Sequence, residues 1–465
     1  MQRLTSNDSA ELPPCDVKGS HVHRASTESK VLPSSTVHGE IETLPQDEYR
    51  VYKRRWLGLA QLALLNLMVS WEWLTFAAVS NTASQYFQVS ESAINWLSTA
   101  FLFAFVAVSP LVMWTLNRGG PKTAIVAASA LMLSGSWIRY AGARATGGHF
   151  GIVMFGQIII GFAQPFVLAA PTRYSNLWFS DKGRVSATAV ASLANPLGGA
   201  LGQLIGPLWA TSTSGVPNMV LYTAIITTIA ALPAPFIPRA PPTPPSAIAA
   251  SETLDLGKAL RELPKNGRFY LLFLPFSVYV GFFNATSSLL NQILEPYGFS
   301  ETEAGIAGGL LIIVGLIASA IVSPIIDRRK TFVLSIKVIV PLLSATYIAL
   351  IFMPSTGSIV GPYVVCAIIG ATSFSLLPCV LEYFTVITHP ISAEITSVVG
   401  WAGGQLLGGI FIIVMTALQG GWKGGPEDNM TRALIFQAVI SCAVVPLPLL
   451  LEVGRFNTSD STVST

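Results

Sequence analysis

Apolar runs of about 20 residues recur along the chain from residue 57 onward, and they constrain the fold more than any other feature. A bilayer core about 30 Å thick is crossed by a helix of about 20 apolar residues. Backbone groups find no water inside lipid, so such runs must be helical. The sequence therefore predicts an all-α membrane protein with twelve transmembrane helices, at residues 57–79, 93–116, 123–142, 150–172, 186–209, 217–238, 269–293, 303–326, 332–353, 359–386, 392–418 and 432–452.

The composition supports a membrane protein over several soluble domains, because 51% of the residues are hydrophobic and only 11% are charged. The 4 cysteines and 5 histidines are scattered, which predicts no metal centre, no haem centre and no other cofactor. The net charge of +3 does not indicate a nucleic-acid partner. Since neither a Ser/His/Asp arrangement nor a His-rich motif is found, we do not expect an enzyme.

One long polar break, at residues 239–268, divides six apolar runs from six. It begins with the Pro-rich stretch 239–246 and continues with a charged, amphipathic stretch at 254–268, so we expect a cytoplasmic linker with a short surface helix. The bundles on its two sides are predicted at 49–238 and 269–453. Residues 1–48 are rich in Ser, Thr, Pro, Asp and Glu and predict a disordered tail, and 454–465 form a second, short tail.

Lys and Arg are concentrated at alternate ends of the runs, and they collect in the cytoplasmic segments if the N-terminus is cytoplasmic. The outer segments then hold only Arg139, Arg144, Lys423 and Arg432. Both termini are therefore predicted to be cytoplasmic. The tail has no clean acidic dileucine signal, which favours the plasma membrane over a vacuole or lysosome. The sequon at Asn429 falls in an outer loop, so we predict a glycoprotein modified there.

The two halves are similar to each other at an offset of about 210 residues. Ser-Pro pairs at 109–110 and 323–324 are each followed by a basic loop, at 117–122 and 327–330. Gly-rich stretches at 195–202 and 403–409 also correspond. Two six-helix repeats about a linker resemble the major facilitator superfamily, whose halves rock about a midplane site. The second loop keeps that superfamily's acid as Asp327, which the resemblance makes a gating residue, whereas the first has Asn117.

A carboxylate stands inside the first run, in the stretch 70–81 that also carries Trp71 and Trp73. A charge at that depth costs roughly 2.5–3.5 kcal/mol, so it normally faces a wet or protein-lined interior. Glu72 is therefore a candidate for proton coupling or cation attraction. The alternative is an interhelical hydrogen bond.

If the resemblance holds, runs one, four, seven and ten line a central cavity. Trp73, Gln164 and Asn284 then lie near one level, where an indole face suits a cation and amides supply directional hydrogen bonds. Tyr279 and Phe283 add aromatic surface, and Gln405 is a weaker candidate. The alternative is that Trp73 packs structurally and the amides bridge helices.

Glu382 lies close to the inner end of the tenth run. A gate or a salt bridge, with Arg173 or Arg184 as partner, fits that position better than ligand contact. The glycines and prolines of the fifth and eleventh runs are expected to let helices approach and bend.

Short motifs in order give a narrower resemblance, to the feline leukaemia virus subgroup C receptor-related family and, within it, to the branch called disrupted in renal carcinoma 2. They are Trp73-Leu-Thr-Phe, Ile94-Asn-Trp-Leu-Ser98, Gly156-Gln157, Ala163-Gln164, Leu177-Trp-Phe179, Asn195-Pro-Leu-Gly198, Leu289-Leu-Asn-Gln292, Leu381-Glu382 and Thr388-His-Pro390, with the linker Pro-Pro-Thr-Pro-Pro-Ser. The resemblance implies uniport or proton-linked movement of choline, ethanolamine or pyridoxine, with haem the weaker candidate. It makes Trp73 and Gln164 choline-contacting positions. Asn284 stands where choline-handling members carry a tyrosine.

These observations predict a monomeric transmembrane transporter of a small organic solute, either an amine or a vitamin-like ring, working by alternating access. Its partners would be the small-molecule substrate and the lipid bilayer. An exporter of a hydrophobic metabolite or drug is the alternative. A non-transporting membrane receptor is more remote.

Overall fold

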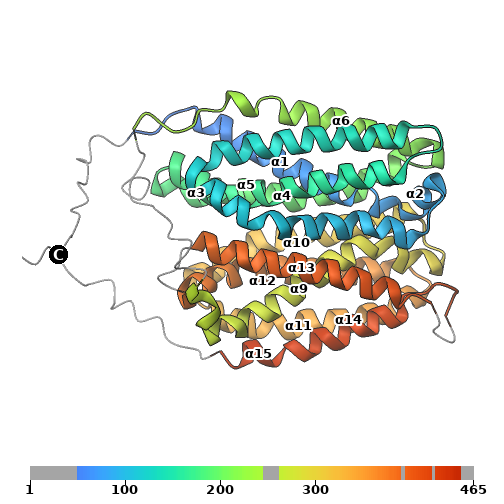
Figure 1. Cartoon of the computed structure of the whole chain (residues 1–465). Helices are drawn as coiled ribbons and strands as arrows, with labels where there is room; N and C mark the ends of the chain where they lie inside the picture. Colours follow the sequence, from blue (N-terminus) through green and yellow to red (C-terminus); the bar gives the residue numbers. More distant parts are fainter. Residues whose placement is uncertain (1–49, 244–260, 389–392, 421–424, 452–465) are drawn as a thin grey trace, which may run out of the picture. The chain divides into compact units, whose positions relative to one another are not determined.

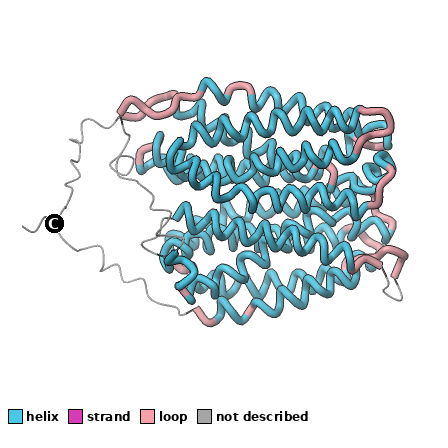
Figure 2. Tube along the Cα trace, viewed as in Figure 1, coloured by secondary structure: helices cyan, strands magenta, loops and turns pink. Residues whose placement is uncertain are grey.

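The structure is a computed structural model that describes residues 50–243, 261–388, 393–420 and 425–451. Within these ranges it consists of helices and loops, with no strand (Figure 2). The predicted tails and most of the predicted linker lie outside the described residues. The helices are α1 (Arg55–Leu74), α2 (Ser80–Phe87), α3 (Glu91–Arg144), α4 (Phe150–Trp178), α5 (Asp181–Trp209), α6 (Val216–Ala231), α9 (Gly267–Leu294), α10 (Glu301–Arg329), α11 (Phe332–Phe352), α12 (Val360–Thr388), α13 (Ala393–Ala417), α14 (Thr431–Val444) and α15 (Pro446–Leu449).

Ten helical segments among the described residues are long and apolar enough to cross a membrane. One of them, α3, has 54 residues and carries both the second and the third predicted run. Its helical hydrogen bonding is interrupted at Gly120, where φ is 72° and ψ is −179°. Only glycine adopts that conformation readily. The loop predicted at 117–122 is therefore a one-residue break followed by Pro121, and the predicted count of twelve is consistent with these ten segments.

Helix packing repeats between the two halves of the chain (Figure 1). In the N-terminal half α1 packs along α5 and α3 packs along α4. In the C-terminal half α9 packs along α13 and α10 packs along α12. The halves meet through α5 with α10 and through α3 with α13, which are again corresponding helices. This arrangement confirms the predicted fold class, an all-α membrane protein built of two pseudo-symmetric helical halves.

Glycine permits the closest of these helix contacts. A β-carbon at Gly198 in α5 would collide with the carbonyl oxygen of Leu67 in α1. In the C-terminal half, a β-carbon at Gly281 in α9 would lie 3.0 Å from the backbone nitrogen of Gly408 in α13. Small residues allow such approach between helices in lipid. The Gly-rich stretches therefore serve the helix framework.

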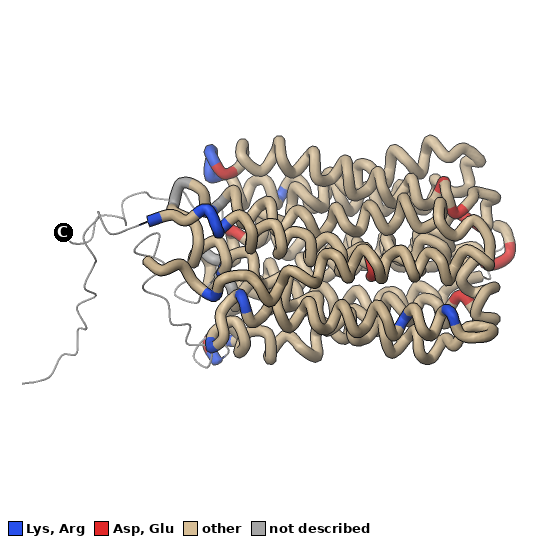
Figure 3. The backbone as a smooth tube through the Cα atoms, turned by 90° about the horizontal axis from the view of Figure 1, so that it is seen from above, with Lys and Arg blue, Asp and Glu red and all other residues tan. Residues whose placement is uncertain are grey.

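Most of the Lys and Arg residues lie at one end of the helices, whereas Asp and Glu occur at both ends (Figure 3). We call the end that carries Arg118, Arg239, Arg268 and Arg328 the basic end. The opposite end carries Glu91, Glu295 and Glu301, at the starts and ends of α3, α9 and α10. Ser300 caps the start of α10 with a capping box. Its hydroxyl accepts a hydrogen bond from the Glu303 N–H, and the Glu303 carboxylate accepts one from the Ser300 N–H.

Candidate functional site

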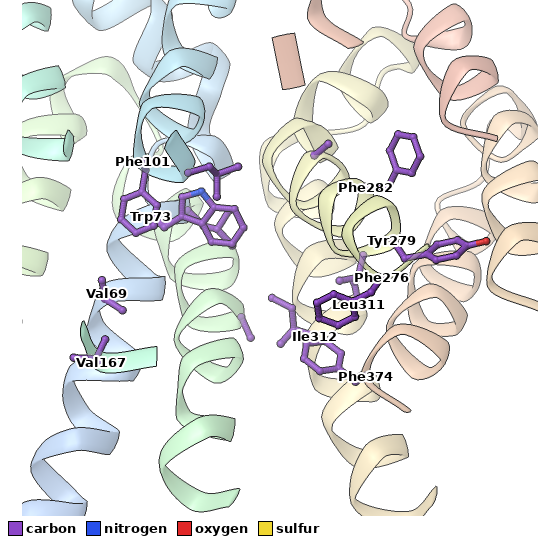
Figure 4. Packing of buried hydrophobic residues seen from close by; sticks show 14 of the residues in the cluster. Val69, Trp73, Phe101, Val167, Phe276, Tyr279, Phe282, Leu311, Ile312 and Phe374 are labelled. Carbon is purple, nitrogen blue, oxygen red and sulfur yellow. The ribbon is translucent and has the colours of Figure 1, made fainter. Parts of the chain in front are cut away.

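Trp73 lies near the C-terminal end of α1, at a level where the chain is surrounded by other helices. Its side chain is only 6% exposed, and its indole stacks on Phe101 of α3 with ring centroids 6.2 Å apart. Figure 4 shows the indole directed from α1 toward the helices that carry Phe276 and Ile312. The indole Nε1 is buried without a hydrogen-bond partner. This nitrogen can therefore donate a hydrogen bond to a bound ligand.

Gln164 reaches a similar level from α4. Asn66 of α1 donates to the Val167 carbonyl of α4 at 2.8 Å, which fixes the register of the two helices. Counted from that bond, Trp73 lies about 10 Å and Gln164 about 4.5 Å toward the opposite end. The Trp73 side chain leans back along its helix and narrows this difference. Gln164 is 3% exposed, and its Oε1 is buried without a partner.

Asn284 faces α13 in the C-terminal half. Its Nδ2 donates to Gln405 Oε1 at 2.9 Å, so these two predicted site residues are joined directly. A β-carbon at Gly408 would lie 3.1 Å from Asn284 and 3.2 Å from Leu102 of α3. Since Leu102 follows the Phe101 that stacks on Trp73, the two halves approach each other here. Helix α3 thus contacts Trp73 through Phe101 and lies next to Gly408, the neighbour of Asn284, through Leu102.

The two predicted aromatic residues of α9 point to different surroundings. Phe283 is half-buried and packs edge-on against Phe374 of α12, with centroids 5.3 Å apart. Tyr279 lies inside the C-terminal half, where its hydroxyl donates to the Ser441 carbonyl at 2.9 Å and its ring stacks on Tyr347 (Figure 4). The Tyr279 hydroxyl therefore donates its hydrogen bond to α14 and not to a ligand.

Glu72 is fully buried within the N-terminal half. Its Oε1 accepts hydrogen bonds from Ser136 and, at 2.7 Å, from Thr227. Arg139 Nη2 lies 3.8 Å from the same oxygen. This geometry supports the interhelical role among the two predicted for Glu72, and proton coupling stays a prediction.

Arg139 is a polar residue whose role the sequence interpretation missed. We counted it only as an outer charge, but its side chain is fully buried. Its Nη1 donates to the Glu72 carbonyl at 2.9 Å and to Gln157 Oε1 at 2.8 Å. The signal that could have found it is Glu72 itself, because a carboxylate in lipid needs a partner. Arg139 lies three residues from the end of its predicted run, so it could have been proposed as the partner of Glu72.

The remaining predicted gating residues lie toward the basic end. Glu382 is exposed near the end of α12, and Arg173 is half-buried on α4, where it lines a cavity. Asp327 accepts from Lys330 at 2.6 Å on the surface, where such a pair contributes little stability. Their gating roles stay predictions.

The Asn429 side chain is 1% exposed, and its Nδ2 donates to the Pro426 carbonyl at 2.8 Å. A glycan on Nδ2 would have to displace that bond and leave a buried position. The folded structure therefore does not favour the predicted glycosylation.

Polar contacts join the two halves at the opposite end. The amides of Asn95 in α3 and Gln292 in α9 donate to each other, at 3.0 and 2.8 Å. Thr82 donates to Glu301 through its N–H and, at 2.7 Å, through its hydroxyl. Gln203 of α5 donates to the Ser287 carbonyl at 2.6 Å. We call these contacts the polar seam; none of them was predicted, because each joins residues distant in the sequence.

Comparison with known proteins gives consistent matches over both halves. A family model, Major Facilitator Superfamily, matches residues 62–413. Solute carrier family 49 member A3 of Danio rerio is 32% identical over 379 residues, 80% of each chain. The choline/ethanolamine transporter flvcr2a of Danio rerio is 27% identical, covering 81% of this chain and 83% of that one. Among solved structures, an inward-facing, unoccupied bacterial homologue of the human lysosomal transporter Spinster has a TM-score of 0.67 at 15% identity, covering 86% of this chain and 97% of that one.

Proposed function

The chain belongs to the major facilitator superfamily and, within it, to the feline leukaemia virus subgroup C receptor-related family, and we propose that the small solute it transports is an organic amine or a vitamin-like ring. The proposed binding site lies between Trp73 and Gln164 on one side and Asn284 on the other. Alternating access would expose this site to the two sides of the membrane in turn.

The observation that carries the proposal is the pair of unpartnered polar atoms. Trp73 Nε1 is a donor and Gln164 Oε1 is an acceptor, and both are buried without a hydrogen bond. Leaving such an atom unpaired costs about 1–3 kcal/mol. A solute that offers both an acceptor and an N–H or O–H donor, as ethanolamine or pyridoxine does, would satisfy both atoms. The Trp73 face would also attract a protonated or quaternary amine.

Choline and ethanolamine are the named solutes of the relative flvcr2a. Here Asn284 already donates to Gln405, so the C-terminal side presents an amide pair in place of the tyrosine of choline-handling relatives. An amide pair recognises a neutral or hydroxylated group better than a quaternary ammonium. This difference favours ethanolamine or a hydroxylated ring such as pyridoxine over choline.

Export of a hydrophobic metabolite is the second candidate. Phe276, Phe283 and Phe374 supply apolar surface on the C-terminal side. A purely apolar cargo would, however, leave the Trp73 and Gln164 atoms unpaired. The polar solute is therefore the stronger proposal.

The distribution of charged residues also suggests how the protein is oriented in its membrane. We infer that the basic end is cytoplasmic, because Lys and Arg favour that side of a membrane (Figure 3). Both termini would then be cytoplasmic, the two bundles would span 49–238 and 269–453, and the plasma membrane is favoured. A monomer is expected, because each half finds its partner within the same chain.

The test is thermal unfolding of the purified full-length protein with choline, ethanolamine, pyridoxine, haem or a hydrophobic drug panel. A solute that binds the folded state raises the unfolding midpoint. We expect ethanolamine or pyridoxine to do so in the wild type and in Trp96→Ala, whose exposed indole is a matched control. Trp73→Ala and Gln164→Ala should abolish the shift and the uptake of the same solute. Unchanged uptake in both variants would refute the site, and a response to apolar drugs alone would favour the exporter.

A further inference from the structure

A cavity of about 240 Å³ lies at the basic end of the N-terminal half, apart from the proposed solute site. Three arginines from three different segments line it. Arg118 lies at the end of the first part of α3, Arg173 belongs to α4 and Arg239 follows α6. Asn117 and Asn176 add two side-chain amides, and none of the described lining residues carries a carboxylate.

Arg118, Arg173 and Arg239 bring three guanidinium groups to the lining of one small cavity. Two unit charges interact by about 1 kcal/mol at 4 Å in water and by about 4 kcal/mol near a protein surface. An anion in the cavity would be attracted to each guanidinium group by an interaction of this size. Planar guanidinium groups match the oxygens of a phosphate in a bidentate way, and amide N–H groups donate to the same oxygens.

The backbone around Gly120 places one of these arginines at the cavity. The break at Gly120 and the following Pro121 end the first part of α3 and contribute to the lining. Position 117 holds Asn, whereas its counterpart in the other half is Asp327. An aspartate at 117 would neutralise part of the positive charge. The asparagine adds no negative charge to the lining.

A half-exposed tryptophan next to Arg118 indicates that the cavity lies at the depth of the lipid headgroups. The Arg118 guanidinium is 5.5 Å from the centroid of the Trp114 ring, which is half exposed. Exposed tryptophans of membrane proteins gather at the membrane–water interface. Basic pockets at the cytoplasmic end of transmembrane helices bind anionic headgroups.

We propose that this cavity binds a phosphate group, supplied either by an anionic lipid headgroup or by a soluble phosphate. The site is separate from the solute site, and its occupancy does not depend on which solute is carried. Occupancy would join α3, α4 and the segment after α6 and so stabilise the N-terminal half.

The test measures binding to the purified full-length protein in detergent. The probes are short-chain phosphatidylinositol 4-phosphate, short-chain phosphatidylcholine and inorganic phosphate. The variant Arg118→Gln/Arg239→Gln is compared with Arg268→Gln/Arg328→Gln, which removes the same charge from the same end but outside the cavity. We expect phosphatidylinositol 4-phosphate to bind the wild type at least about tenfold more tightly than the cavity variant, with the control variant close to the wild type.

The two sources give different outcomes, and both support a phosphate site. Binding of phosphatidylinositol 4-phosphate that inorganic phosphate does not displace assigns the cavity to lipid, and equal displacement by inorganic phosphate assigns it to a soluble ligand. Arg118→Lys keeps the charge but not the bidentate geometry and should bind with intermediate affinity. Failure of both phosphate probes to bind the wild type, or an equal loss in the cavity and control variants, would overturn the proposal.

Discussion

Arg139 Nη2 lies 3.8 Å from Glu72 Oε1, and both side chains are fully buried inside the N-terminal half. The pair is held by further bonds, because Ser136 and Thr227 donate to Glu72 while Arg139 donates to Gln157. The Arg139 guanidinium also lies 5.4 Å from the centroid of the Phe76 ring. The most polar group of residues in this half therefore ties α1, α3, α4 and α6 together.

Removing one member of this pair leaves the other charge buried and uncompensated. We expect Glu72→Gln or Arg139→Gln to lower the free energy of unfolding by about 3–5 kcal/mol. The double variant Glu72→Gln/Arg139→Gln should be less destabilised than the sum of the two, because neither charge remains. Unfolding of the purified variants in detergent measures this. Single variants as stable as the wild type would contradict the structural role.

The Asn284–Gln405 hydrogen bond couples the two residues at the solute site. Asn284→Ala leaves Gln405 Oε1 without its donor, at a cost of about 1–3 kcal/mol. We expect solute uptake by Asn284→Ala to fall about tenfold, with a similar fall for Gln405→Ala. The double variant should be no worse than either single one. Additive losses would show that the residues act separately. Uptake in vesicles, normalised to folded protein, is the measurement.

The polar seam must separate when the opposite end opens. Asn95→Ala and Gln292→Ala each remove both bonds of the reciprocal amide pair and should favour that opening. The reporter is Ser288→Cys, buried in α9 behind the seam, in a chain whose 4 native cysteines are replaced. Its labelling by a membrane-impermeant thiol reagent added at the opposite end should speed up several-fold. An unchanged labelling rate would assign opening to other contacts.

Gly198 has no room for a side chain against α1. Gly198→Ala would collide with the Leu67 carbonyl and should lower the free energy of unfolding by about 1–3 kcal/mol, or prevent folding. Gly267→Ala is the matched control, since a β-carbon at this helical position meets nothing within 4 Å. Yields of monodisperse protein and unfolding midpoints distinguish the two. Equal behaviour would mean that α5 can move away from α1.

The hydropathy pattern predicted the helices well because a chain that crosses lipid must pair its backbone groups within the crossing segment. The predicted runs 150–172 and 332–353 correspond to α4 (Phe150–Trp178) and α11 (Phe332–Phe352). The break predicted at 117–122 does separate the second and third runs, but it is shorter than a loop, with one Gly in a special conformation followed by Pro121. The basic-residue rule did not show that Arg139 is buried, because it counts charges near a helix end without knowing which face they occupy.

The candidate site was predicted only in outline. Trp73, Gln164 and Asn284 are buried where the helices meet, and their binding role stays a proposal. Tyr279 shows the limit of the approach. It was predicted to add aromatic surface to the site, yet the rotation of α9 turns its hydroxyl to Ser441 in α14.

The amino-acid sequence by itself determined that this chain is a set of membrane-spanning helices in two related halves with one basic end. Long apolar runs, repeated motifs and the placement of Lys and Arg act locally, one helix at a time. Only the tertiary structure decided which face of each helix meets which neighbour. The contacts of Glu72 with Arg139 and of Asn95 with Gln292 depend on it, and so does the cavity lined by three arginines. The rotation and depth of a helix in lipid are set by its packing partners, and those lie far away in the sequence.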